Sequence, residues 1–415
     1  MPKRIIFVDD DPMVLSGLER SLYSMRPEWE MAFVTGGEEA LRSMANQPFD
    51  VMVTDMRMPV MSGAQLLEEV KQRYPRCLRF VLSGQADKET ILKSINPAHQ
   101  FLSKPCKTDE LKRRLGCAFA VRGLIQNPEL RGLVSKLESL PSLPTLYIKL
   151  TNEINKSNPS MATVGRLVSE DMAMTAKILQ LVNSPFFGLR VQVSNPSNAV
   201  QLLGLDIIKA LVVSSHVFSK FQTKLLSEAG VDYFWRRSLA VGSYAKRIAS
   251  LEKATQRVED DCFAAGLLHD VGKLILASAA REKYGEVLAL VKNGGTNLLV
   301  AESDVLGCSH AEVGEYLLGV WGLPDSVIEA VAFHHGPSED CQSQFSPLVA
   351  THIASIYFER QNPYWLQDGT VVDVDYLRKT GCLEREQIWS RALGGATSES
   401  LKVPETSGAA ELDSR

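Results

Sequence analysis

Short apolar runs alternate with helix-like segments from the start of the chain to residue 121. One run, Val51–Val53, consists of apolar β-formers and ends at Thr54 and Asp55, ahead of a proline-containing turn. A short apolar run followed by a helical segment is typical of a buried parallel strand. The alternation therefore predicts an α/β doubly wound, five-stranded parallel sheet with helices on both faces. The expected strands are Ile5–Val8, Met31–Thr35, Val51–Thr54, Leu78–Leu82 and Gln100–Ser103, and the expected helices are Pro12–Leu22, Glu38–Met44, Gly63–Tyr74, Asp87–Ile95 and Thr108–Arg122.

After residue 135 the periodicity changes, and one helical pattern follows another, which predicts an all-α domain. The segment 122–134 contains Asn127-Pro128, a helix-stopping pair, and we expect it to be a linker. The expected organisation is thus a first domain over 1–121, a helical domain over 135–340, a helical extension over 341–393 and a disordered tail over 394–415. The expected helices are Leu146–Lys156, Met161–Ser169, Met174–Asn183, Asn195–Leu203, Asp206–Phe218, Asp232–Leu251, Val258–His269, Arg281–Val291, His310–Val320, Asp325–His335, Leu348–Glu359, Asp373–Thr380 and Glu384–Leu393.

Composition narrows the class of protein. The chain has 415 residues, of which 45% are hydrophobic, so a substantial core can form. A net charge of −4 gives no polybasic footprint for nucleic acid. The seven cysteines are scattered without a C-x-x-C pair, which fits a reducing compartment. No apolar run approaches the ~20 residues that span a bilayer, and we expect a soluble, cytoplasmic protein without membrane insertion.

Polar side chains stand where several of the predicted strands end. They are Asp9, Asp10, Asp55, Ser83 and Lys104. The carboxyl ends of strands converge on one rim of a doubly wound sheet, so we expect these side chains to lie together. Clustered carboxylates require a compensating cation, and Mg²⁺ accepts such oxygen ligands. A carboxylate in this setting can act as a nucleophile and form an aspartyl phosphate, which points to phosphoryl transfer.

The first domain resembles the receiver domain of bacterial two-component response regulators, which has a flavodoxin-like fold. The residues that carry the resemblance are Phe7–Pro12, Val53–Pro59, Met61–Gly63, Val81–Gly84 and Phe101–Pro105.

The resemblance implies that Asp55 is the phosphoacceptor. It implies that Asp9, Asp10 and the backbone carbonyl of Arg57 bind Mg²⁺ together with Asp55, and that Lys104 pairs with the phosphate. By the same resemblance Ser83 donates a hydrogen bond to a phosphoryl oxygen, and Phe101 is the aromatic residue that changes rotamer. The implied partner is a sensor histidine kinase, and the resemblance allows a homodimer through the face of the fourth and fifth helices.

Histidines gather at helix ends in the second domain. His269 is followed directly by Asp270, His310 begins a helix, and His334 and His335 end another. Together they would make a Zn²⁺, Fe or Mn²⁺ hydrolase site. A lone histidine is more often a capping or packing residue, and the sequence leaves both interpretations open.

The second domain resembles an HDOD domain, a member of the HD-type helical superfamily. The residues that carry the resemblance are Ser139–Pro144, Val182–Gly188, Ala199–Gly204, Phe234–Ser238, Gly266–Lys273 and His334-His335.

The match departs from a catalytic HD site in three places. Arg237 stands where catalytic relatives have a first histidine, and His352 stands near their final aspartate. No glycine-tyrosine-proline motif follows His335. Because a guanidinium has no free lone pair, Arg237 cannot ligate a metal, and we expect none in this domain. Our hypothesis is that Arg237 places a fixed positive charge near Asp270, where a metal would otherwise be.

Two classes of function remain. In the first, phosphorylation of Asp55 changes the receiver and the helical domain passes the signal to an unknown protein partner. In the second, the helical domain is a metal-dependent phosphodiesterase that cleaves a cyclic dinucleotide. The sequence favours the first, because the metal site lacks a ligand. A DNA-binding regulator is disfavoured, since no basic recognition helix is evident.

Overall fold

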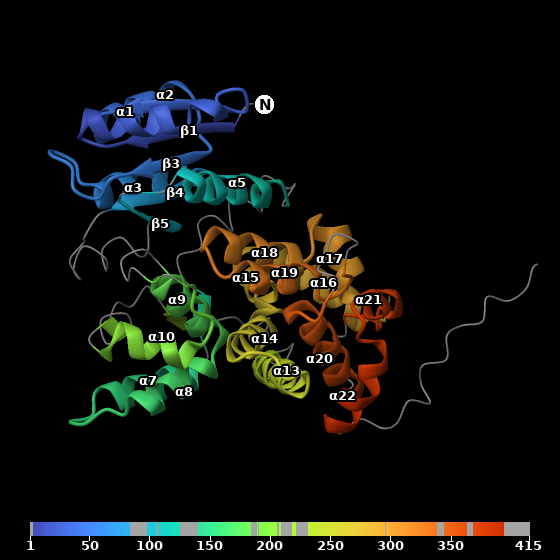
Figure 1. Ribbon diagram of the computed structural model, residues 1–415. Coiled ribbons are helices and arrows are strands. Elements are labelled where there is room, and N and C mark those ends of the chain that lie inside the picture. Colours follow the sequence, from blue (N-terminus) through green and yellow to red (C-terminus); the bar gives the residue numbers. More distant parts are fainter. Residues whose placement is uncertain are drawn as a thin grey trace, which may run out of the picture.

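The computed structural model describes residues 3–83, 98–104, 106, 108–124, 140–142, 144–183, 189, 191–205, 207–208, 218–220, 231–294, 296–337, 344–362 and 368–393. The expected helix at Asp87–Ile95, most of the linker, most of the helix at Asp206–Phe218 and the tail over 394–415 lie outside the described residues. Figure 1 shows the sheet and its helices at one end of the molecule and the helical part at the other.

The first domain is built on one parallel sheet, as predicted. Its order is β2-β1-β3-β4-β5, and all neighbouring strands run parallel. The central strand β3 is fully buried, which explains its uninterrupted apolar sequence. The strand bounds are β1 Lys3–Val8, β2 Trp29–Val34, β3 Val51–Thr54, β4 Leu78–Ser83 and β5 Gln100–Ser103.

Helices cover both faces of this sheet. Alternate residues of each strand point to opposite faces, so Phe7 and Ile6 belong to different cores. Helices α1 (Pro12–Ser21) and α5 (Thr108–Leu124) supply side chains to the Phe7 face, whereas α2 (Gly37–Asn46) and α3 (Gly63–Arg73) supply the Ile6 face. The Phe7 core continues into the helical domain, because α5 packs against a helix of that domain, α18 (His310–Val320).

The rest of the described chain is mainly helical, with two short parallel strands, β6 (Leu140–Ser142) and β7 (Phe218–Lys220). The sequence predicted neither strand, because three residues are too few to show a periodicity. The helices are α7 Pro144–Ile154, α8 Met161–Ser169, α9 Met172–Val182, α10 Pro196–Leu203, α13 Val231–Leu251, α14 Gln256–Leu268, α15 Val271–Ala279, α16 Arg281–Lys292, α17 Leu298–Leu306, α18 His310–Val320, α19 Asp325–Phe333, α20 Pro347–Gln361, α21 Val374–Lys379 and α22 Glu386–Ala392, and the 3₁₀ turns are η1 Tyr23–Met25 and η3 Leu383–Arg385.

Two of these helices, α15 and α17, were missing from the sequence prediction. Helix α15 follows α14 after only His269 and Asp270, so the two read as one apolar stretch. Helix α17 carries its own end signals: the Asn297 side chain accepts a hydrogen bond from Val300 N, and Gly307 adopts φ 72° just after the last turn.

The stretch Gln256–Ala279 bears on the expectation that no apolar run is long enough to span a bilayer. It is 24 residues long with a mean hydropathy of 1.3 in its best window, so by length and composition it could cross a bilayer. However, 83% of that window is buried inside the protein, as expected for a core helix pair.

Candidate functional site

The first candidate site lies at the carboxyl ends of the parallel strands. Asp9 follows β1, Asp55 follows β3 and Lys104 follows β5. Lys104 Nζ lies 2.6 Å from Asp9 Oδ2 and 2.6 Å from Asp55 Oδ1. The structure thus brings these three residues together at one rim.

Asp9 and Asp55 are buried, and Asp10 is exposed. The second oxygen of Asp55, Oδ2, accepts a hydrogen bond of 2.7 Å from the backbone N–H of Arg57. Burial alone would lower the pKa of the Lys104 ammonium, but hydrogen bonds and charge attraction from Asp55 and Asp9 outweigh it and raise this pKa. The ammonium therefore stays charged between the two carboxylates.

The turn after Asp55 is held tightly against the rim. The N–H of Gly63, the first residue of α3, donates to the carbonyl of Met56. A Cβ on Gly63 would lie 2.0 Å from the backbone oxygen of Asp55, so only glycine fits there. Ser62 caps α3 in a reciprocal capping box with Gln65, which fixes where the turn ends.

The donor set at this rim suits a hard cation. The carboxylates of Asp9 and Asp55 provide the type of oxygen that Mg²⁺ prefers, whereas Asp10 and the carbonyl of Arg57 stay predicted ligands. Ser83 is the last residue of β4, and Lys104 follows the neighbouring strand β5, so both residues lie at the same rim. The side chains of Ser83 and Phe101 lie outside the described residues, so their predicted roles stay predictions.

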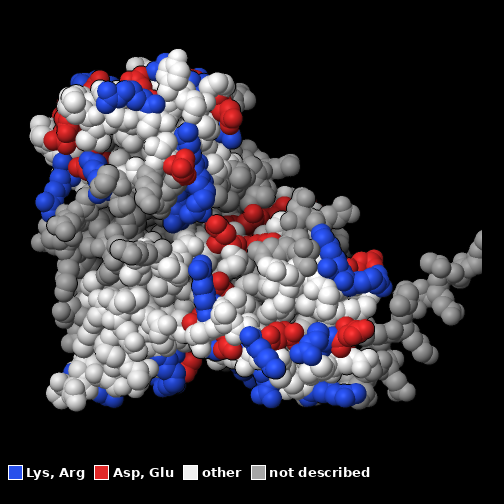
Figure 2. Space-filling model, in the orientation of Figure 1, with Lys and Arg blue, Asp and Glu red and all other residues white. Residues whose placement is uncertain are grey.

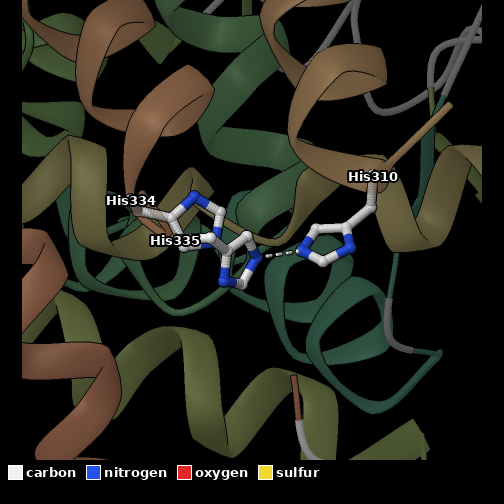
Figure 3. A group of neighbouring side chains, drawn as sticks. All are labelled: His310, His334 and His335. Carbon is white, nitrogen blue, oxygen red and sulfur yellow. Dashed lines mark hydrogen bonds between the residues drawn. The ribbon is translucent and has the colours of Figure 1, made fainter. Parts of the chain in front are cut away.

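The second candidate site is buried in the helical domain. Figure 3 shows His310 facing His334 and His335, with a hydrogen bond between His310 and His335. His269, Asp270 and His334 also lie close together, because one ligand atom from each falls within 4.8 Å of the others. The predicted histidines therefore converge, and His352 is the exception.

His352 does not join this cluster. Its Nδ1 lies 2.7 Å from the carbonyl oxygen of His334, and its Nε2 accepts a hydrogen bond from the backbone N–H of Asp373. Both ring nitrogens of His352 are therefore occupied by backbone groups, one of them the carbonyl of the site residue His334. Burial lowers the pKa of His352, and a neutral ring fits this donor–acceptor pattern.

Arg237 joins the cluster through Asp270, and it is only 2% exposed. Its Nε lies 2.7 Å from Asp270 Oδ2, as the sequence hypothesis expected. Its other nitrogens contact two carboxylates that the sequence analysis missed, Glu359 Oε1 at 2.6 Å and Asp368 Oδ2 at 2.6 Å. A single guanidinium thus holds three buried carboxylates.

A second cation supports the same carboxylates. Lys273 Nζ lies 2.9 Å from Asp270 Oδ1 and 2.7 Å from Asp368 Oδ1. Burial opposes the charge of Lys273, but Asp270 and Asp368 outweigh it and raise its pKa. Each oxygen of Asp270 therefore faces a cation, Oδ1 facing Lys273 and Oδ2 facing Arg237.

His310 belongs to a chain of hydrogen bonds. Its Nδ1 lies 2.7 Å from Glu302 Oε2, its Nε2 lies 2.8 Å from His335 Nε2, and His335 Nδ1 lies 2.5 Å from Thr370 Oγ1. Burial would lower the pKa of His310, but Glu302 overrides it and raises this pKa to about 9, whereas burial holds the pKa of His335 well below its usual range. A charged His310 donating to both neighbours and a neutral His335 donating to Thr370 satisfy the whole chain.

His269 and His334 both turn Nε2 into the buried cluster. The Nδ1 of each lies within 2.9 Å of a backbone oxygen in its own helix, which makes Nδ1 the donor. Nε2 of His334 is buried and has no hydrogen-bond partner among the described residues, whereas Nε2 of His269 lies 3.2 Å from Asp270 Oδ2. Burial lowers the pKa of both imidazoles. With Asp270 these nitrogens have the chemistry of a metal-binding group.

The same region is already supplied with positive charge. Arg237, Lys273 and the charged His310 face Asp270, Asp368 and Glu302 at ion-pair distance. Glu359 is a further carboxylate, and its pKa is raised by burial and then by Asp368. A buried cluster in which cations and anions balance in this way needs no added ion for charge compensation. A divalent cation at Asp270 would also be repelled by Arg237 and Lys273.

Some of these partners left a signal in the sequence. Lys273 follows Asp270 by three residues, a spacing that places both on one helix face. Asp368 left none, because it lies in a connection after α20 and no motif surrounds it.

Two family models match the chain. A response regulator receiver domain matches residues 5–116, and an HDOD domain matches residues 140–337. The chain carries a receiver domain joined to an HDOD domain. Both matches lie within the domain bounds that the sequence analysis expected. A receiver domain implies, in general, a phosphodonor kinase as partner.

Curated relatives match parts of the chain. An uncharacterised protein of Treponema pallidum is 25% identical over 238 residues, or 56% of this chain and 45% of the relative. The hydrogenase transcriptional regulatory protein HoxA of Cupriavidus necator is 33% identical over 122 residues, which is 29% of this chain and 25% of the relative. The response regulator protein PilR of Pseudomonas aeruginosa is 29% identical over 39% of this chain and 35% of the relative. The chain therefore spans less than half the length of each of these relatives.

Solved structures give similar matches. The MmoQ response regulator from Methylococcus capsulatus is 25% identical, covers 62% of this chain and 98% of its own, and has a TM-score of 0.46. A receiver domain of an HD domain-containing protein from Pseudomonas fluorescens is 28% identical over 30% of this chain and 98% of its own, with a TM-score of 0.29.

Proposed function

We propose that the protein is a phosphorylation-dependent response regulator of a two-component system, in which Asp55 accepts a phosphoryl group and the HDOD domain relays the signal by binding another protein. The observation that carries the proposal is Lys104, whose ammonium lies 2.6 Å from both Asp9 and Asp55. A cation placed between two carboxylates at a strand rim can also hold phosphoryl oxygens.

The residues at the rim have separate tasks in this proposal. An oxygen of Asp55 attacks the phosphorus of the donor, and the bond from phosphorus to the donor atom breaks as the new P–O bond forms. Lys104 stays charged and pairs with the phosphoryl oxygens. Asp9, Asp10 and the carbonyl of Arg57 would hold Mg²⁺, which neutralises charge on the transferred group when it is bound.

The helical domain acts as a binding module in this proposal and not as a phosphodiesterase. The support is Arg237, which contacts Asp270 at 2.7 Å in the place of a metal ligand. Because Lys273 faces the other oxygen of Asp270, a metal would have to displace two buried cations. We therefore propose that this domain is metal-free and non-catalytic.

Hydrogen exchange tests the relay. The full chain is incubated with acetyl phosphate and Mg²⁺, and amide exchange is compared between the wild type and Asp55→Asn. A relay requires exchange within residues 140–337 to change in the wild type and to stay constant in the variant. Exchange that changes in the receiver alone would contradict a relay through the HDOD domain.

Metal analysis and activity assays test the proposal that the HDOD domain is metal-free and non-catalytic. We expect purified wild type to hold no stoichiometric Mn²⁺, Fe or Zn²⁺, and to cleave neither bis-p-nitrophenyl phosphate nor a cyclic dinucleotide when Mn²⁺ or Fe²⁺ is added. The matched variant Arg237→His replaces the cation with a potential ligand. Stoichiometric metal in the wild type that Asp270→Ala removes would overturn the proposal of a metal-free domain.

A further inference from the structure

The receiver covers one face of the HDOD domain. Gln100, at the start of β5, donates from Nε2 to the carbonyl of Gly319 at 3.0 Å, although these residues lie in different domains. From α5, Arg114 Nη1 donates to the carbonyl of Gly322 at 3.4 Å, and Arg113 Nη1 lies 3.2 Å from Asp325. These contacts cover the end of α18 and the start of α19, and Gln180 of α9 adds a hydrogen bond of 3.2 Å to the carbonyl of His99 in the receiver.

Charge is complementary across this contact. The HDOD side carries Glu315, Asp325 and Glu329, and the receiver side carries Arg113 and Arg114; all five line one cavity of about 290 Å³ between the domains. Figure 2 shows acidic side chains in the hollow below the receiver, with basic side chains above them. The apolar residues that line the cavity all come from the HDOD side, and they are Leu323, Ile328 and Phe333.

The helix α5 fills this face incompletely. Glu315 is half-buried, and no described cation forms an ion pair with it. Burial, and then the charge of Glu312, raise its pKa to about 7, which reflects a carboxylate without compensation. An exposed ion pair such as Arg113–Asp325 adds little stability, so the charged edge of this contact is its weakly held part.

We propose that the acidic face formed by Glu315, Asp325 and Glu329 is the docking surface for the output partner, and that this partner presents a basic amphipathic helix in the place that α5 takes here. This inference rests on the proposed function, because it names the surface through which the HDOD domain would relay the signal. The apolar residues beside the acidic ones suit the apolar stripe of such a helix. A lysine or arginine of the partner would pair with Glu315, with which no described side chain of α5 forms an ion pair.

One strand connects this surface with the phosphoacceptor rim. Strand β5 is only four residues long. Lys104 follows its last residue and contacts Asp55, and Gln100 begins it and contacts Gly319. A displacement of Lys104 towards a phosphoryl group would act on the strand that ends in the contact with the HDOD domain.

A peptide with the sequence of residues 108–124 is the probe for the surface. The peptide is labelled with fluorescein, and its binding to the full-length protein is followed by fluorescence anisotropy. Full-length Arg113→Glu/Arg114→Glu protein should lose its own α5 contacts, and small-angle scattering should report a larger radius of gyration. We expect this protein to bind the peptide at least tenfold more tightly than the wild type does. Adding Glu315→Gln and Asp325→Asn should remove that gain.

Lys112→Glu is the matched control. Lys112 lies on the same helix, but its Nζ donates to Ser24 of the receiver at 2.9 Å, so its reversal should neither open the protein nor raise peptide binding. A peptide with both arginines replaced by glutamate should not bind. An opened protein that binds the peptide no better than the wild type, or a protein that stays closed without both arginines, would overturn the inference. No step uses phosphorylation, so these outcomes are independent of whether Asp55 reacts.

Discussion

Replacing Arg237 by methionine should strongly destabilise the helical domain. The variant keeps an unbranched stem and removes one charge that lies 2.7, 2.6 and 2.6 Å from Asp270, Glu359 and Asp368. Removing one partner of a buried ion pair costs about 3–5 kcal/mol, because the other charge is left uncompensated. Glu359 already has a raised pKa and can take up a proton, which limits the loss to the lower end of that range.

Differential scanning calorimetry and urea unfolding measure this loss. For a domain of this size about 1 kcal/mol corresponds to ~2–4 °C, so a loss near 3 kcal/mol should lower the melting temperature by roughly 6–12 °C. The penalty should shrink as the pH falls, because the orphaned carboxylates then become protonated.

The neighbour Arg236 provides the control. It is exposed on the same helix, and Arg236→Met should change stability by less than ~0.5 kcal/mol. An Arg237→Met protein as stable as the control at neutral pH would refute the view that this guanidinium holds the cluster together.

Three further results are expected. The pKa of His310 is raised to about 9 from an ordinary 6.5, so the ion pair between charged His310 and Glu302 stabilises the fold fully below pH 6.5. This contribution, at most ~3 kcal/mol, is lost as the pH rises through 9. Urea unfolding between pH 6 and 10 should show the decline in stability, and His310→Gln should abolish that decline. Lys104→Met should slow phosphorylation by acetyl phosphate by about 10- to 100-fold, the effect of losing one or two charge-assisted hydrogen bonds, and an unchanged rate in intact-mass time courses would exclude that role. Gly63→Ala should destabilise the receiver by at least ~1–3 kcal/mol, because the new Cβ would meet backbone atoms. Gly17→Ala should stabilise the receiver slightly, because its Cβ would meet nothing within 4 Å. Calorimetry that finds Gly63→Ala more stable than Gly17→Ala would contradict the packing at the rim.

The rim that holds Asp9, Asp55 and Lys104 could be predicted from the sequence because a parallel sheet gathers strand ends. Asp9, Asp55 and Lys104 are far apart in the chain, yet each follows an apolar strand, and that position alone brings them together. The rule needs no knowledge of side-chain packing, so it survives small errors in where each strand ends.

The helical site was only half predictable. Arg237 and Asp270 stood in motifs, so their pairing could be expected. Glu359 and Asp368 could not be found, because nothing in a helical sequence says which polar side chains of a later helix and its following loop turn into the core. The hydrogen bonds of His352 were hidden for the same reason: both of its ring nitrogens bond to backbone groups.

The mass of the intact chain after incubation with acetyl phosphate and Mg²⁺ tests the central claim most directly. We predict a gain of one phosphoryl group in the wild type and in Asp50→Asn, which alters the opposite end of β3, and no gain in Asp55→Asn. An unchanged mass in the wild type, or an equal gain in Asp55→Asn, would contradict the assignment of Asp55 as the phosphoacceptor.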